Sequence, residues 1–195
     1  MEKVNLIELN PSGVRNALIL EGWGTNTSLY LKLAETVAAL GYRVLLPDLP
    51  GFGKSPEPVS SWSCADYAAF IDSLLAEHNI TRVTLIGHSH GGRVIIKAVG
   101  EKLLSAEVER IILIGSAGIV HEKTEEQRRA AKRYQKVKKL LSVCPPLLEV
   151  YRRKKGSEDY RSASPVMRDT LVKCINEDLR HLLPNITAPA LLLFG

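Results

Sequence analysis

The sequence lacks the features that mark secreted, membrane-spanning and disulfide-bonded proteins. No apolar run reaches the roughly 18 residues that a membrane-spanning helix needs, and residues 1–8 carry charges where a signal peptide has its apolar segment. The three cysteines, Cys64, Cys144 and Cys174, are scattered and lack the paired spacing of a disulfide framework or a zinc site. We therefore predict a cytoplasmic protein without a membrane span or a bound metal.

Nucleotide and nucleic-acid binding motifs are also missing. There is no Gly-x-x-x-x-Gly-Lys-Ser/Thr loop, and no Gly-x-Gly-x-x-Gly opens a helix after the first strand. No helix-turn-helix, zinc finger or aromatic-basic pattern is present. We expect no cofactor and no nucleic-acid partner, and the oligomeric state stays open. A chain of 195 residues with 45 % hydrophobic content is long enough to bury the core of one domain.

Positive charge is concentrated in one segment. Residues 121–181 hold 16 Lys and Arg against 9 Asp and Glu, a balance of +7, whereas the whole chain carries +5. This pattern indicates a solvated helical face, and attraction of an anionic substrate or a membrane surface is the weaker alternative.

The richest pattern in the chain is Gly87-His88-Ser89-His90-Gly91, which follows the apolar run 83–86 and precedes a run with helical spacing. Gly-x-Ser-x-Gly between a strand and a helix is the nucleophile elbow of acyl-transfer enzymes. The sharp turn strains the backbone of Ser89 and raises its hydroxyl above the sheet, and the two glycines leave room that a Cβ would fill. A glycine-rich strand-to-helix turn of an ordinary doubly wound domain is the alternative.

Apolar runs and helical patterns alternate along residues 1–118. We expect strands at 4–9, 17–20, 43–46, 83–87 and 110–115, the first of them at a sheet edge. A helix over residues 28–40 carries the apolar stripe Leu29, Leu33, Val37 and Leu40. A second helix is capped by Ser61 or Ser63 and ends near residue 78. This alternation predicts an α/β fold with a mostly parallel sheet.

The pattern changes after residue 118. No strand is expected between about 119 and 185, and helices are expected at 125–141, around 147–153 and at 166–183, the last two separated by a polar stretch at 156–164. Residues 188–195 then begin one more sheet strand. We expect three parts: a core over 1–118, a helical cap over 119–185 and the start of the next core strand over 186–195.

Four segments in this order resemble the α/β-hydrolase fold family, in particular its capped esterases and related hydrolases. They are residues 21–24 (Glu-Gly-Trp-Gly), 48–55 (Asp-Leu-Pro-Gly-Phe-Gly-Lys-Ser), 87–91 (Gly-His-Ser-His-Gly) and 188–195 (Ala-Pro-Ala-Leu-Leu-Leu-Phe-Gly). The resemblance implies that the cap lies between the sixth and seventh family strands. It also implies that the final strand and helix elements are missing from this chain.

The resemblance assigns the nucleophile to Ser89. It places the oxyanion hole at the backbone N–H of His90 and at one from the loop after the third family strand, most plainly Trp23 with Gly22 beside it. The family usually has His where this chain has Glu21, and we expect Glu21 to hydrogen-bond a neighbouring loop. The family's catalytic acid and His follow later strands, so the resemblance implies that both are absent from this chain.

No other histidine is expected to replace the missing base. His88 and His90 flank Ser89 and point away from it, His78 and His181 lie at helix ends, and His121 begins the cap. Asp48 is read as structural. The expected function is therefore a serine hydrolase that acts on an ester, a thioester or a related carboxylic substrate through an acyl-serine intermediate. Hydrolysis of a carbon–carbon bond in a dienoate is a variant of the same chemistry. The alternative is a truncated, non-catalytic pseudoenzyme or binding protein of the same fold that takes up a small molecule.

Overall fold

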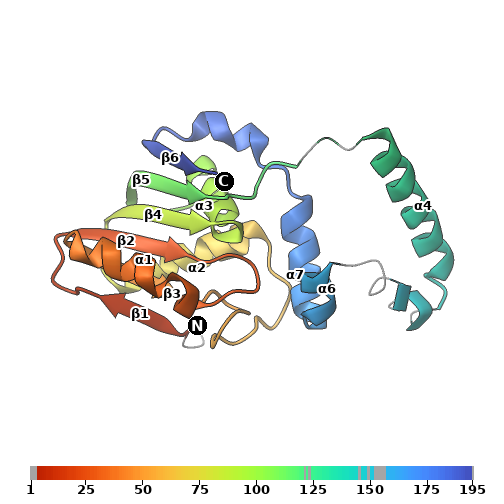
Figure 1. The fold of residues 1–195 in the computed structure, drawn as a ribbon, viewed down its shortest axis with the longest axis horizontal. Coiled ribbons are helices and arrows are strands. Elements are labelled where there is room, and N and C mark those ends of the chain that lie inside the picture. Colours follow the sequence, from red (N-terminus) through yellow and green to blue (C-terminus); the bar gives the residue numbers. More distant parts are fainter. Residues whose placement is uncertain are drawn as a thin grey trace.

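The chain folds around one mostly parallel sheet of six strands (Figure 1). The computed structural model describes residues 4–120, 122, 124–144, 146–148, 150–151 and 157–194. Its strands are β1 (Leu6–Leu9), β2 (Arg15–Leu20), β3 (Tyr42–Pro47), β4 (Arg82–His88), β5 (Glu107–Ile114) and β6 (Ala190–Leu193), in the spatial order β1-β3-β2-β4-β5-β6. Only β1 runs antiparallel, at the edge beside β3. The predicted α/β fold with an N-terminal edge strand is confirmed.

Helices cover both faces of the sheet. Alternate residues of β2 separate the two cores, because Leu18 and Leu20 pack with α2 (Cys64–Glu77) and α3 (His90–Gly100), whereas Ala17 and Ile19 pack with α1 (Thr27–Ala39). Such two-sided burial explains why residues 17–20 of β2 form an uninterrupted apolar run. Ser63, one of the two predicted caps of α2, accepts the N–H of Asp66, whose side chain accepts the N–H of Ser63 in return.

The predicted apolar stripe of α1 was wrong in part. Leu29 and Leu40 are each 66 % exposed, and the residues that α1 buries are Thr27, Tyr30 and Ala34. The helix is rotated toward Tyr30 because the Tyr30 hydroxyl bonds the loop after β2 and the end of β4. The spacing of apolar residues cannot predict a helix face that is fixed by hydrogen bonds of a tyrosine hydroxyl.

The sheet order creates a switch point between β2 and β4. The chain leaves β2 for β3 on one side and returns through α2 to β4 on the other, and Leu20 of β2 lies opposite Gly87 of β4. The loops after these two strands therefore diverge from neighbouring carboxyl ends, which is where open α/β sheets form binding crevices.

Among its described residues, the segment between β5 and β6 holds helices joined by loops and no strand. It contains α4 (Glu125–Leu141), α6 (Glu158–Ser162), α7 (Pro165–Asn176) and the 3₁₀ helix η1 (Arg180–Asn185). The prediction missed α6, which begins where the Ser157 side chain accepts the Tyr160 N–H. It also extended the last helix too far: α7 ends at Asn176 because Glu177 adopts extended backbone and its carbonyl accepts from Arg93.

The two ends of this insert meet on the core. The N–H of Leu179 donates to the carbonyl of Gly118 at 2.9 Å, and Arg180 donates to the carbonyl of Val120 at 3.0 Å. Between these two ends of the insert, α6 and α7 lie next to the core and α4 lies farther out (Figure 1). None of the helices that the structure describes is long and apolar enough to cross a membrane.

Candidate active site

Ser89 sits at the turn between β4 and α3 in a strained backbone conformation. Its φ is 48° and its ψ is −106°, a region that L-residues other than glycine rarely adopt. Three backbone hydrogen bonds fix it there: its N–H donates to the carbonyl of Ile114, and its carbonyl accepts from Arg93 and Ala117. A strained residue held by its surroundings is typical of a functional turn.

The two flanking glycines are required by close backbone contacts. A Cβ at Gly87 would lie 2.6 Å from the nitrogen of Gly92, and one at Gly91 would lie 2.4 Å from the carbonyl oxygen of Leu20. Both are far inside contact distance, and backbone atoms do not rotate aside as a side chain does. The turn packs so tightly against β2 and α3 that both flanking positions of the Gly-x-Ser-x-Gly pattern must be glycine.

Two backbone N–H groups near Ser89 have no hydrogen-bond partner among the described residues, those of Trp23 and His90. Their neighbours are occupied: Gly22 donates to the Tyr30 hydroxyl at 2.9 Å, and Gly91 donates to the carbonyl of Glu21 at 2.9 Å. Of the three residues expected at the oxyanion hole, Gly22 thus borders the site with its own N–H already used. The bond from Gly91 to Glu21 also ties the elbow directly to the loop that carries Trp23.

The two histidines beside Ser89 have their partners on different elements. His88 Nδ1 lies 2.8 Å from the Tyr30 hydroxyl of α1. The His90 ring packs edge-on against Trp23, with centroids 5.3 Å apart, and against Tyr67 at 5.1 Å. Neither ring contacts the Ser89 hydroxyl, as expected for neighbours on a sharp turn.

Burial keeps the His90 imidazole neutral. The residue is 4 % exposed, and its Nε2 finds no hydrogen-bond partner in the described part of the chain. Desolvation, with the positive charge of Arg93 as a second cause, lowers the pKa of His90 to about 3. An uncharged ring inside an aromatic cage is a packing element of the elbow.

Glu21 is fully buried and points to the neighbouring loop, as the sequence suggested. Its Oε1 accepts the N–H of Leu49 at 2.7 Å, and its Oε2 has no partner among the described residues. Burial raises the pKa of Glu21 to about 8, against the lowering effect of the Leu49 hydrogen bond, and the nearby Asp48 raises it further. At neutral pH the carboxyl group is therefore protonated and adds no negative charge beside Trp23.

Asp48 organises the loop after β3. Its two carboxylate oxygens accept from the Asn5 side chain and from the N–H groups of Thr27 and Lys54 at 2.6–2.9 Å. The sequence interpretation of Asp48 as structural agrees with these contacts.

The Ser89 hydroxyl has no histidine or carboxylate partner among the described side chains. His78 contacts Arg43 at the end of α2, and His181 contacts the carbonyl of Asp178. His121 lies outside the described residues. The described chain thus holds the elbow and two free N–H groups but no general base for Ser89.

A cavity of about 360 Å³ opens between these loops and the insert. Trp23 and Phe52, which also contact the His90 ring, line it from the core. From the insert and the loop after β3 come three carboxylates, which are Glu57, Glu158 and Asp159. None of the described residues that line this cavity is a Lys or an Arg, so the described lining is acidic although the insert as a whole is basic.

Hydrogen bonds hold the insert in this position. The Ser164 hydroxyl, which caps α7, donates to Glu57 Oε2 at 2.6 Å. On α7 itself, the Thr170 hydroxyl accepts from the Trp62 N–H, and the Lys173 ammonium donates to the carbonyl of Ser61. The cavity wall is therefore built jointly by the core loops and α7.

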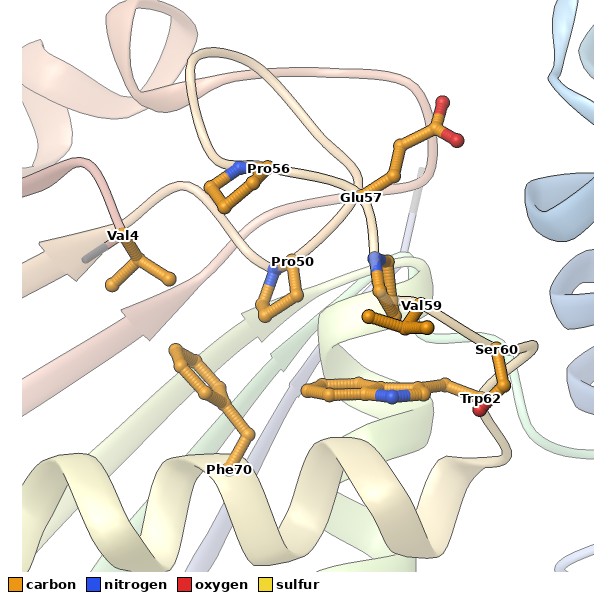
Figure 2. Close-up of a pocket in the computed structure, with 9 residues that line it drawn as sticks. Val4, Pro50, Pro56, Glu57, Val59, Ser60, Trp62 and Phe70 are labelled. Carbon is orange, nitrogen blue, oxygen red and sulfur yellow. The ribbon is translucent and has the colours of Figure 1, made fainter. Parts of the chain in front are cut away.

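A second hollow, of about 330 Å³, lies under the loop 56–62 on another part of the surface. Figure 2 shows the rings of Trp62, Phe70 and Pro50 around it, while the Glu57 carboxylate points away. Trp23 does not line this hollow, and Ser89 is among the lining residues of neither of the two cavities. It is an apolar recess separate from the elbow, and among the described residues no cluster of His, Cys, Asp and Glu is arranged to hold a metal ion.

Comparisons with known proteins agree with the fold. A family model described as alpha/beta hydrolase fold matches residues 18–150. The chain superposes on an esterase from Exiguobacterium antarcticum with a TM-score of 0.67 and 22 % identity, covering 97 % of this chain and 75 % of that one. A hydrolase from Oleispira antarctica gives 0.69 and 17 %, with coverage of 98 % and 76 %.

Curated relatives match a shorter stretch. A haloalkane dehalogenase from Psychrobacter cryohalolentis is 30 % identical over 101 residues, which is 51 % of this chain and 33 % of the relative. A 2-hydroxy-6-oxononadienedioate/2-hydroxy-6-oxononatrienedioate hydrolase from Cupriavidus pinatubonensis is 33 % identical over 109 residues, or 53 % and 37 %. The matched segment thus spans about a third of the length of these relatives.

Proposed function

Because this chain belongs to the alpha/beta hydrolase fold family, we propose that it carries the nucleophile and the oxyanion-binding groups of a serine hydrolase. In this proposal the Ser89 oxygen attacks the carbonyl carbon of an ester or thioester, and a base outside the described side chains takes its proton. The alcohol or thiol leaves, an acyl-Ser89 intermediate remains, and water releases the carboxylic acid.

The N–H groups of Trp23 and His90 are assigned to the negative charge that develops on the carbonyl oxygen. Backbone donors suit this role because they are fixed before the reaction and need no reorganisation. The dipole of α3 points its positive end at the same place. Loss of one such donor typically lowers kcat by about 100- to 1,000-fold.

One observation carries the proposal: Ser89 holds a φ of 48° at a strand-to-helix turn, beside two N–H groups without partners in the described chain. An ordinary connection would relax the strain and use the free donors. Instead, three hydrogen bonds and two tight glycines maintain this geometry.

The cavity beside Trp23 is proposed to receive the substrate, with α6 and α7 acting as its cap. The curated relatives span different substrates by name, a haloalkane and a dienedioate. The acidic lining of this cavity favours a neutral or positively charged substrate, since Glu57, Glu158 and Asp159 would repel a carboxylate. Carbon–carbon hydrolysis of a dienedioate is the less favoured variant for that reason.

Covalent labelling tests the assignment of Ser89. An alkyl fluorophosphonate should phosphonylate Ser89, and peptide mass spectrometry should find the adduct there and lose it in Ser89→Ala. Ser105→Ala, which changes a serine remote from the elbow, serves as the control. An adduct on another residue, or equal labelling of Ser89→Ala, would refute the proposal.

A non-catalytic binding protein of the same fold is the second candidate. It is favoured by the absence of a base for Ser89 among the described side chains. It predicts that labelling is no faster than for a free serine hydroxyl, while small neutral esters still bind in the cavity. Saturable binding of an ester without turnover, measured by calorimetry, would select this alternative.

A further inference from the structure

The outer part of the insert presents a surface that no other described element covers. We define this outer surface as α4 together with the described residues 142–144, 146–148 and 150–151. Its exposed cations are Arg128, Arg129, Lys132, Arg133, Lys136 and Lys139. Its exposed aliphatic side chains are Leu140, Val143, Leu147 and Val150, which are 55–87 % exposed. In Figure 1, α4 stands beyond α6 and α7, away from the sheet.

The cations of this surface are not neutralised locally. In the part of the chain that the structure describes, Arg129 alone among them forms an ion pair, with Glu125 at 3.6 Å. The acidic residues of α4 are confined to its first turn, Glu125 and Glu126, where they complement the helix dipole. The rest of the helix therefore offers uncompensated positive charge.

Helix α4 has an N-terminal cap and an aromatic contact within its own segment. Thr124 accepts the Gln127 N–H and receives the reciprocal bond from the Gln127 side chain, which forms a capping box. Tyr134 stacks on Tyr151 with centroids 5.4 Å apart, so one side of α4 packs against the end of its own segment.

Cationic and aliphatic side chains share the other side. Arg133, Lys136 and Leu140 are spaced three and four residues apart, which places them on one face of a helix. A helix that is merely solvated keeps large aliphatic groups away from its charged face. Here Leu140 is 74 % exposed among lysines and arginines, and Val143 follows at 87 %.

We propose that the outer surface docks on an anionic lipid bilayer. Cations beside exposed aliphatic groups suit the bilayer interface, where the cations meet anionic headgroups and the aliphatic groups enter the acyl boundary. Nucleic acid would use the charges but gives the aliphatic groups no partner, because bases stack on aromatic or guanidinium planes. Seven Lys and Arg among 17 residues make α4 an interfacial helix and not a spanning one. This inference does not depend on the hydrolase assignment.

Vesicle co-sedimentation of the full chain tests the inference. We expect binding to vesicles of phosphatidylcholine with about 30 % phosphatidylglycerol, weak binding to phosphatidylcholine alone, and a loss of binding as salt is raised. Arg133→Gln with Lys136→Gln should weaken binding about 25-fold, because each cation near such a surface contributes about five-fold. Leu140→Ser with Val143→Ser should weaken it about ten-fold.

Matched controls separate docking from general charge and from unfolding. Lys32→Gln with Lys54→Gln removes the same charge from exposed positions of the core and should leave binding unchanged. Circular dichroism should be the same for all variants, because every substituted side chain is exposed. Equal binding to both vesicle types, or no binding to either, would overturn the inference. So would duplex DNA that competes fully with vesicles and binds Leu140→Ser/Val143→Ser as tightly as the unaltered chain.

Discussion

The loops at the carboxyl end of the sheet bury their side chains tightly, whereas the helix α4 exposes most of its side chains. At the elbow, Gly87 and Gly91 occupy positions where an added Cβ would lie less than 3 Å from neighbouring atoms, and the titratable side chains His90 and Glu21 are buried and uncharged at neutral pH. On α4, cations and aliphatic groups are exposed and mostly unpaired within the described chain. The first region holds the atoms of the proposed active site in fixed positions, and the second exposes the side chains of the proposed docking surface.

This contrast bears on the positive charge of the insert. The excess of positive charge in residues 121–181 predicted a solvated helical face, with attraction of an anionic substrate or a membrane surface as the weaker alternative. In the fold, the cations of α4 are kept apart from the cavity, and the insert contributes Glu158 and Asp159 there. If the cavity receives the substrate as proposed, the side chains at its wall decide the preference, since exposed charges farther away are screened by salt.

The largest effect on the free energy of unfolding is expected when a glycine of the elbow is replaced by alanine. Gly91→Ala places a Cβ 2.4 Å from the Leu20 carbonyl oxygen, so the turn must shift as a unit. We expect a loss of at least about 3 kcal/mol in the free energy of unfolding, measured by urea denaturation. Gly41→Ala, where φ is +88° but nothing lies within 4 Å, should cost about 1 kcal/mol. Equal costs at the two sites would show that the elbow is loosely packed.

His90 is expected to make the protein sensitive to acid. Its folded pKa of about 3 lies below the ordinary 6.5, so the unfolded chain binds more protons between these values. The stability that His90 contributes is present above pH 6.5 and is lost as the pH falls toward 3. When the pH is lowered from 7 to 4.5, the free energy of unfolding should fall by on the order of 2 kcal/mol less in His90→Phe than in the unaltered chain. His181→Phe, which replaces an exposed histidine, is the control.

Glu21 is expected to act in the opposite direction. Its folded pKa of about 8 lies above the ordinary 4.5, so the folded chain binds more protons between these values and stability falls as the pH rises through this window. The Glu21→Gln side chain cannot ionise. Relative to the unaltered chain, the free energy of unfolding of this variant should therefore rise by on the order of 2 kcal/mol between pH 5 and 8. Glu77→Gln, on the exposed end of α2, is the control. A parallel pH profile for Glu21→Gln would contradict the protonated state.

The smallest effect is expected on α4. Lys136→Ala or Leu140→Ala should change the free energy of unfolding of the core by less than about 0.5 kcal/mol, because both side chains are exposed. Thermal unfolding followed at the sheet and core helices checks this. A change above about 2 kcal/mol would mean that α4 packs on the core and is not available for docking.

Local chemistry made much of the site predictable. The glycine spacing around Ser89, the cap at Ser63 and the structural role of Asp48 all depend on short stretches of sequence, and each agrees with the fold. The face of α1 did not follow its apolar pattern, because the partner of Tyr30 is His88, which lies 58 positions away in sequence.

Features formed by distant segments escaped prediction. Glu57 and Asp159 line one cavity although about a hundred residues separate them, and no pattern in the sequence pairs them. The Gly22 N–H was grouped with the oxyanion donors, but the Tyr30 hydroxyl occupies it. Such pairings arise from the topology of the sheet, which brings the ends of β2, β3 and β4 under the insert.

The role of Ser89 is tested most directly by hydrolysis of p-nitrophenyl acetate by the chain and by its Ser89→Ala variant. Alanine keeps the backbone of the elbow and removes only the hydroxyl, so a difference reports nucleophilic catalysis. The account predicts that p-nitrophenol release by the unaltered chain exceeds the background release of Ser89→Ala but is slow, because no base for Ser89 lies among the described side chains. Equal rates for the two proteins would contradict it and would leave the fold as a binding scaffold.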